Sequence, residues 1–89
     1  MKSIIPGNHP NRCYLCHRYG NTQTHHMLHG IRRKAADKYG LTVYLCADCH
    51  RELHDHGRDD LYLEQVAQEE FELRHGHDKF LEVFGKNYL

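Results

Sequence analysis

Two Cys-x2-Cys pairs, Cys13 with Cys16 and Cys46 with Cys49, constrain the fold of this 89-residue chain more than any other feature. Each pair holds two thiolates on one tight turn, and two such turns complete the tetrahedral shell that Zn²⁺ takes in structural sites. A domain of this size buries little surface, so a metal clip commonly stabilises it. We therefore predict one structural Zn²⁺ ion bound by all four cysteines. Four thiolates leave no coordination position open, so this ion would support folding and not chemistry.

A redox dithiol and an iron–sulfur cluster are the other uses of such cysteines. Nothing in the sequence resembles the βαβ unit that carries a thioredoxin-type Cys pair. The chain has no apolar run long enough to span a membrane, and its start has too few apolar residues for a signal-peptide core. We expect a cytoplasmic protein without membrane contact. In that compartment paired cysteines are better interpreted as metal ligands than as disulfides.

The residues around the cysteines predict a small α+β fold with a strand–strand–helix core. β-prone runs at 22–28 and 41–45 predict the two strands of a hairpin, joined through a short helical turn at 33–38. The second Cys pair leads directly into a helix at about 48–55, which Gly57 ends.

The two ends of the chain are expected to be an arm and a helical block. Asp59 or Asp60 can cap a helix over 61–73, and a last short helix is expected at 79–84. The apolar stripe of the longer helix would consist of Leu63, Val66, Ala67, Glu70, Phe71 and Leu73. We predict one domain, 1–89, made of an N-terminal arm (1–12), a zinc knuckle with the strand–strand–helix core (13–57) and a helical C-terminal scaffold (58–89).

Histidines next to the cysteines suggest a second metal site. His25 and His26 are adjacent on the first strand, where neighbouring side chains point to opposite faces. His50 and His54 are four residues apart on the helix and so share one face. One strand imidazole and two helix imidazoles would leave positions open for water and a phosphate oxygen, as a catalytic metal requires. The other strand histidine is a candidate general base, because imidazole titrates near neutral pH. We interpret the isolated histidines as surface polar groups: His9, His17, His29, His75 and His77.

The order of these motifs resembles the HNH nucleases, also called His-Me finger or ββα-metal nucleases, whose zinc-bearing members carry the same frame. It is closest to small phage-encoded members of the recombination-enhancement kind. The shared segments are His25-His26, a Gly-and-basic run at 30–34, Lys-Tyr-Gly-Leu at 38–41 and the Cys-x2-Cys-His block at 46–50. The resemblance covers residues 13–56 well and the tail at 84–89 loosely. It implies a phage- or prophage-encoded endonuclease that leaves a 5′-phosphate and a 3′-hydroxyl.

The resemblance also implies a role for each histidine. His25, His50 and His54 would bind the catalytic cation, which could be Mg²⁺, Mn²⁺ or Zn²⁺. His26 would be the general base that deprotonates water. His56 competes with His54 for the third ligand position, because the spacing varies among related phage proteins.

One position departs from the family pattern. The family has an Asn about five residues before Cys46 that helps to orient the base. This chain has Leu41 there, with Thr42 beside it. Another group must then orient His26, or the chain binds its target without cutting it.

The charges are distributed unevenly although the net charge is zero. Residues 1–51 carry eight Lys or Arg and two Asp, a formal charge of +6, and residues 52–89 carry −6. The basic half favours a nucleic-acid partner, whereas acidic helices that fold back would neutralise it. We expect DNA-phosphate contacts from Arg32, Arg33, Lys34, Lys38 and Arg51, unless these belong to a solvated loop. Such contacts carry no sequence information and weaken steeply with salt.

Two other functions fit the same residues. A non-catalytic zinc module that binds nucleic acid or protein would account for the missing Asn. A purely structural protein with two zinc ions would hold the second ion in a closed histidine site. The choice between DNA and RNA stays open. A protein partner or a homodimer is expected, because a finger this small has little surface with which to read a sequence.

Overall fold

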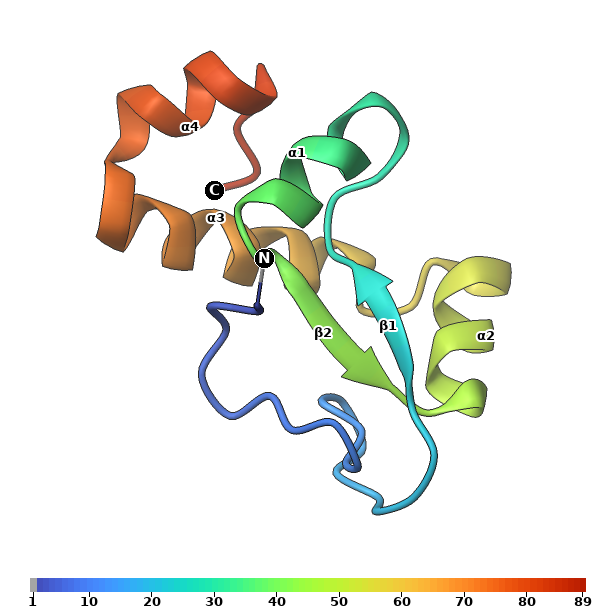
Figure 1. Ribbon diagram of the computed structural model, residues 1–89. Helices are drawn as coiled ribbons and strands as arrows, with labels where there is room; N and C mark the ends of the chain where they lie inside the picture. The colour runs from blue at the N-terminus through green and yellow to red at the C-terminus, as the bar shows by residue number, and fades with distance from the viewer. Residues whose placement is uncertain (1) are drawn as a thin grey trace.

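The computed structural model describes residues 2–89, and a two-stranded antiparallel sheet lies at its centre (Figure 1). Strand β1 (Gln23–His26) pairs with β2 (Thr42–Leu45), so that His25 lies opposite Val43 and His26 opposite Thr42. Both strands lie within the predicted runs and are shorter than expected. Together with the helices they confirm the predicted small α+β fold.

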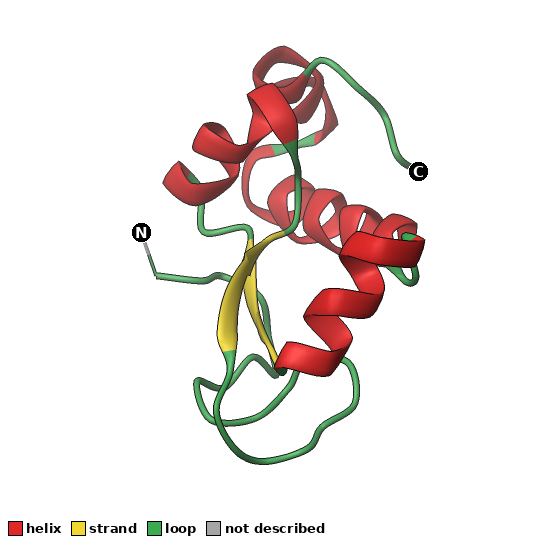
Figure 2. Cartoon of the chain, turned by 90° about the vertical axis from the view of Figure 1, so that its right-hand side faces the viewer, coloured by secondary structure: helices red, strands yellow, loops and turns green. Residues whose placement is uncertain are grey.

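Helix α2 (Ala47–His56) starts at the end of β2 and lies alongside β1 in both views (Figures 1 and 2). The helix begins here because the Cys46 thiol caps it by accepting a hydrogen bond from the Cys49 N–H. Gly57 ends the helix in the left-handed conformation, with a φ of 65°. The predicted strand–strand–helix order is therefore present.

The connection between the strands contains a 3₁₀ turn, η1 (Gly30–Arg32), and a short helix, α1 (Arg33–Lys38), at the predicted position. After α1 the chain turns at Gly40, whose φ of 73° favours glycine. Residues of the N-terminal arm pack directly against this turn: the Ile4 N–H donates to the Gly40 carbonyl over 2.9 Å.

The arm follows the edge of β2 that faces away from β1. Ser3 donates from its hydroxyl to the Thr42 carbonyl over 2.6 Å, and the Tyr44 N–H donates to Asn8 Oδ1 over 2.8 Å. The Ile5 side chain is buried. Residue 1 of the predicted arm lies outside the described residues. The arm thus covers a strand edge that would otherwise be open.

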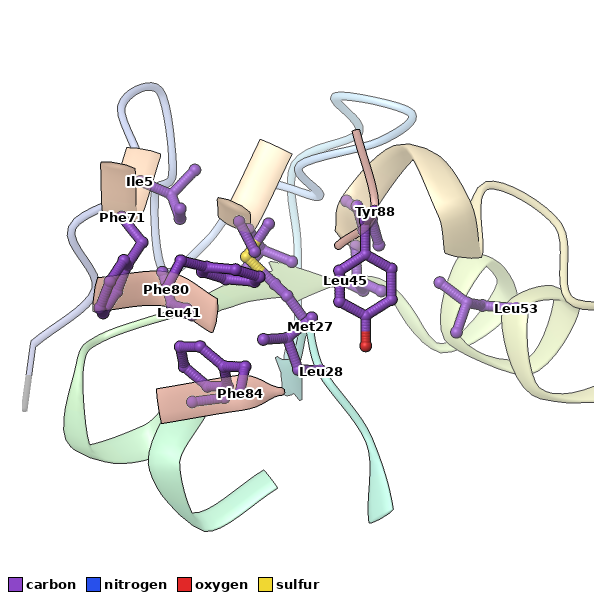
Figure 3. Close-up of a cluster of buried hydrophobic side chains, with 14 of the residues drawn as sticks. Ile5, Met27, Leu28, Leu41, Leu45, Leu53, Phe71, Phe80, Phe84 and Tyr88 are labelled. Carbon is purple, nitrogen blue, oxygen red and sulfur yellow. The ribbon is translucent and has the colours of Figure 1, made fainter. Parts of the chain in front are cut away.

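The C-terminal helices α3 (Asp60–His75) and α4 (His77–Phe84) pack against each other, and the ring of Tyr39, just after α1, packs against Phe71 of α3 (Figure 1). Their buried aromatic rings, Phe71, Phe80 and Phe84, lie 4.7–5.5 Å apart between centroids. Figure 3 shows these rings with the apolar side chains that come from the sheet and from the arm. Arg32 of η1 donates to the Phe84 carbonyl over 2.7 Å and ties α4 to the strand connection.

The predicted stripe of α3 was wrong at its end. Leu73 is 80% exposed, whereas Gln68 is fully buried. The reason is the C-terminal tail, which packs on this helix. Gln68 accepts a hydrogen bond from the Tyr88 N–H over 2.7 Å and donates to Asn87 Oδ1 over 2.7 Å. A polar residue that is buried because it hydrogen-bonds a distant part of the chain cannot be recognised from the spacing of apolar residues. Within residues 2–89 no helix is both long and apolar enough to cross a membrane.

Candidate metal centres

The four cysteines form one cluster, with all Sγ atoms within 4.8 Å of one another. Cys13 and Cys16 come from a turn before β1, whereas Cys46 and Cys49 come from the start of α2. All four are free thiols, and Cys16 Sγ lies 3.8 Å from Cys46 Sγ. Tetrahedral Zn²⁺ with bonds of about 2.3 Å places its thiolates roughly 3.8 Å apart. The cluster therefore has the dimensions of the predicted structural zinc site.

Hydrogen bonds lower the pKa of two of these thiols and so favour the thiolate form that binds a cation. Burial raises the pKa of the Cys13 thiol, but backbone N–H donors, that of Cys16 foremost, outweigh it and leave the pKa below its usual range. Burial also raises the pKa of the Cys46 thiol, but hydrogen bonds, chiefly from Cys49, outweigh this effect and leave the pKa below its usual range. Burial and the neighbouring thiols raise the pKa of Cys49. Four thiolates packed this closely need a cation between them to be charged together.

A second cluster contains four imidazoles and lies where β1 meets α2. His25 of β1 is at its centre, with a 3% exposed side chain. Its ring centroid lies 5.3 Å from that of His50 and 6.4 Å from that of His54. The Nε2 atoms of His50 and His54 are 3.2 Å apart, as expected for positions i and i+4 on one helix face. A fourth ring, His29, lies 5.3 Å from His25.

These imidazoles surround a hollow of about 270 Å³ that is open to solvent. Its lining comes from β1, the following loop and α2, and consists of Thr24, His25, His26, His29, Gly30, Arg33, His50 and His54. The hollow contains all four histidines of the predicted catalytic site. His54 belongs to the lining, whereas His56 is exposed at the end of α2.

His25 has the burial and the ring chemistry of a metal ligand. Its Nε2 atom is buried and has no hydrogen-bond partner among the residues that the structure describes. Burial, followed by the nearby charges of His29 and His50, lowers the pKa of His25 to about 4. Burial also lowers the pKa of His50. Both rings are therefore neutral near pH 7, the state in which imidazole binds metals. A buried nitrogen without a partner is costly unless a cation occupies its lone pair.

The structure adds two residues that sequence reasoning missed. His29 was interpreted as a surface group, but it is half-buried, and its Nε2 lies 2.7 Å from Asp60 Oδ1. Ligand atoms of His25, His29 and Asp60 all lie within 4.8 Å of one another. Asp60 was considered only as a helix cap, and the cap position is occupied by Asp59. His29 and Asp60 are 31 residues apart, so no motif spacing could have paired them.

His26 points to different partners from those of His25, as the alternation of a strand requires. Its Nε2 lies 3.1 Å from Asp37 Oδ1 of α1, and Arg33 donates from Nε to its Nδ1 over 3.4 Å. Arg33 can only donate, so Nδ1 carries the lone pair and Nε2 carries the proton that faces Asp37. Leu41, at the position of the family's Asn, is fully buried in the core and has no group that could orient His26.

The predicted phosphate-binding residues divide into two groups. Arg32 donates to the Phe84 carbonyl, and Arg51 pairs with Asp48 at 2.8 Å, so both have partners within the chain. Arg33 lies at the hollow beside His26. Lys34 and Lys38 are exposed on α1. A basic rim made by α1 therefore adjoins the histidine cluster.

Comparisons with protein-family models, with curated proteins and with solved structures find no match for this chain. The geometry itself gives a small α+β domain with a four-cysteine cluster and a His/His/Asp group of metal-ligand dimensions.

Proposed function

We propose that this chain is a metal-dependent DNA endonuclease of the HNH type, which hydrolyses phosphodiester bonds. One observation supports the proposal most strongly: His25 from β1 and His50 and His54 from α2 gather around one solvent-open hollow. The order strand, strand, helix is the order that the resemblance to the HNH family implies. The same hollow contains His26, the implied general base.

The residues present fit a divalent cation. His25 offers a buried nitrogen that has no hydrogen-bond partner among residues 2–89, and His50 and His54 present their rings from one helix face with their Nε2 atoms 3.2 Å apart. Three imidazoles leave coordination positions open toward the hollow. A divalent ion bound there supplies Lewis-acid polarisation of a phosphoryl oxygen and stabilises charge on the leaving oxygen.

His26 would take the proton of the attacking water on Nδ1, the nitrogen that carries the lone pair. Asp37 would hold the ring in this tautomer by accepting the Nε2–H, as a carboxylate does for a catalytic histidine elsewhere. The water oxygen bonds to phosphorus as the bond from phosphorus to the 3′-oxygen breaks, and solvent protonates the departing 3′-oxygen. In the structure Arg33 donates to Nδ1 of His26. When DNA is bound, the Arg33 guanidinium would instead turn to the phosphate and stabilise its charge. Asp37 thus replaces the family's Asn in our proposal.

DNA would be held mainly through its phosphates. Lys34 lines a surface hollow together with Arg33, and Lys38 lines the adjoining one together with Lys34, so a strand entering the histidine hollow would pass this basic rim. Such binding positions the backbone without reading bases, and a protein partner or a second copy would then select the target. Arg32 and Arg51 contribute less, because each already has a partner within the chain.

A plasmid-nicking assay with Mg²⁺ or Mn²⁺ tests the proposal. The parent should convert supercoiled plasmid to nicked circles, and His26→Ala should lose at least about a hundredfold of the rate, the usual contribution of a general base. Asp37→Asn should reduce the rate less. His9→Ala is the matched control, because His9 is exposed on the N-terminal arm and does not belong to the hollow's lining, and it should cut like the parent. Equal cutting by the parent and His26→Ala would contradict the proposal.

The second candidate is a zinc module that binds nucleic acid without cutting it. The observation that favours it is Leu41, which fills the position of the family's Asn and is buried. DNA binding by the parent and by His26→Ala, with no nicking in either, would support this function. Absence of both activities, with two tightly held zinc ions, would support a purely structural role.

A further inference from the structure

We propose that His25, His29 and Asp60 form a binding site for a divalent transition-metal ion, so that α3 supplies a carboxylate ligand to the histidine cluster. The inference keeps the proposed function but revises its ligand set, because His29 and Asp60 take the places of His50 and His54 around His25; it rests on that function only for its catalytic meaning. It assigns a chemical role to Asp60, a residue of the segment that the sequence predicted as scaffold.

The distances favour this donor set over the one that the resemblance implies. Within residues 2–89, ligand atoms of His25, His29 and Asp60 lie mutually within 4.8 Å, a criterion that the set of His25, His50 and His54 does not meet. One neutral imidazole offers a single lone pair to a metal. An ion held by His25 together with His29 and Asp60 would therefore not be shared through the same nitrogen with the helix pair His50 and His54.

The buried nitrogen of His25 is an independent sign of a ligand. Within the described part of the chain, His25 Nε2 has no hydrogen-bond partner, and the residue is only 3% exposed. The only carboxylate near this ring within 2–89 that belongs to a group of metal-ligand dimensions is that of Asp60. In our proposal the cation binds His25 through this nitrogen, which would satisfy it and give Asp60 a charged partner.

The local fold leaves Asp60 free for this role. Asp60 is the first residue of α3, but the cap position belongs to Asp59, and no side chain caps the helix. The Asp60 N–H donates to the Gly57 carbonyl at the turn between α2 and α3. This turn brings the carboxylate to His29, which follows the buried residues Met27 and Leu28 at the end of β1. His25 and His29 both line the open hollow, which gives an ion a path to the site.

The donor set also predicts which metal binds. Two imidazole nitrogens and one carboxylate oxygen suit Mn²⁺, Fe²⁺, Co²⁺ or Zn²⁺. Mg²⁺ prefers oxygen ligands in an octahedral shell and would compete poorly. Mn²⁺ is the suitable probe, because Mn²⁺ does not favour the thiolates of the cysteine cluster.

The alternative is a plain hydrogen bond from His29 to Asp60 that anchors α3. Asp60→Asn separates the two roles, because the amide keeps an acceptor oxygen for His29 but loses the charge that a metal ligand needs. Asp59→Asn is the matched control: it removes the same charge from the adjacent residue, which lines a different hollow, beside Cys49 and Glu52. Asn also tolerates the φ of 62° found at position 59.

The experiment titrates Mn²⁺ into the zinc-loaded protein and measures affinity by calorimetry. The parent should bind one Mn²⁺ that millimolar Mg²⁺ does not displace. Asp60→Asn should weaken binding roughly 10–100-fold, the range for loss of a group that holds a metal, and Asp59→Asn should leave it unchanged. Equal affinity for the parent and Asp60→Asn would overturn the inference.

A second variant covers the case in which Asp60→Asn does not fold. His29→Ala should likewise weaken Mn²⁺ binding roughly 10–100-fold, because it removes one proposed ligand and leaves His50 and His54 in place. Equal Mn²⁺ affinity for His29→Ala and the parent would overturn the inference. The proposed function can fail separately. Mn²⁺ binding that depends on Asp60, without any nicking of plasmid, would contradict the nuclease activity and still support the metal site.

Discussion

His25 combines deep burial with a free ring nitrogen, and this combination determines how the histidine cluster responds to pH. Its neighbours include His29, His50 and His54, all of which repel a proton on His25, and Asp60, which attracts one. Burial is the largest effect and lowers the pKa of His25 to about 4. The native protein therefore keeps this ring neutral under conditions in which an unfolded chain would protonate it.

The lowered pKa of His25 predicts that acid destabilises the protein when no metal occupies the histidine cluster. An unfolded His titrates near 6.5, so below that pH the unfolded chain binds a proton that the folded chain refuses. Stability should be independent of His25 above about pH 6.5 and fall steadily between about 6.5 and 4, by a total on the order of 3 kcal/mol. Urea unfolding of the zinc-loaded protein at several pH values measures this. His25→Gln should flatten that part of the profile, and an unchanged slope would contradict the assignment.

At the scale of elements, β2 depends on the segments that pack around it. One edge pairs with β1, and the other is covered by the arm, which meets the chain again at Gly40. A Cβ atom at Gly40 would collide with the Lys2 carbonyl oxygen and crowd Ile4. The close approach of two backbones therefore requires glycine at this turn.

Gly40→Ala tests the contact between the arm and this turn. The variant combines a strained φ of 73° with a backbone collision, and it should lose roughly 2 kcal/mol or more of unfolding free energy. Gly57→Ala is the matched control, because its φ of 65° is similar and nothing lies within 4 Å of its Cβ. Chemical denaturation of both variants gives the comparison. Equal losses would show that the arm contributes nothing at Gly40.

Elements with a local signal were predictable, and contacts between distant segments were not. The helix at 33–38 and the cap of α2 by Cys46 follow from neighbouring residues, and the cysteine spacing itself indicated the thiolate cluster. His50 and His54 share a face because four residues make about one helical turn. The hydrogen-bond partners of Gln68 and His29 lie 19 and 31 residues away in the sequence. The periodicity of a single helix or strand contains no information about such contacts.

At the scale of the whole molecule, the two candidate metal centres are coupled through α2. The cysteine cluster fixes the first turn of this helix to the knuckle before β1, and the helix then carries His50 and His54 to the ring of His25. His50 also contacts Gln23 at the start of β1, with Nδ1 2.6 Å from Oε1. The position of the histidine cluster therefore depends on whether the cysteine cluster is closed.

Removal of the structural zinc should abolish binding at the histidine cluster although no histidine changes. Structural Zn²⁺ contributes about 10–16 kcal/mol of apparent binding free energy in small zinc domains, which equals or exceeds the whole stability of a typical domain. A strong chelator, or Cys46→Ser, should therefore unfold α2 and release the knuckle, with loss of helical circular dichroism and of Mn²⁺ binding together. Asp60→Asn should by contrast weaken Mn²⁺ binding while the helical signal stays intact, because Asp60 lies at the start of α3 and is not part of the cysteine cluster. A zinc-free chain that kept its helical signal would show that the aromatic core of α3 and α4 suffices for folding, and the coupling through α2 would then be wrong.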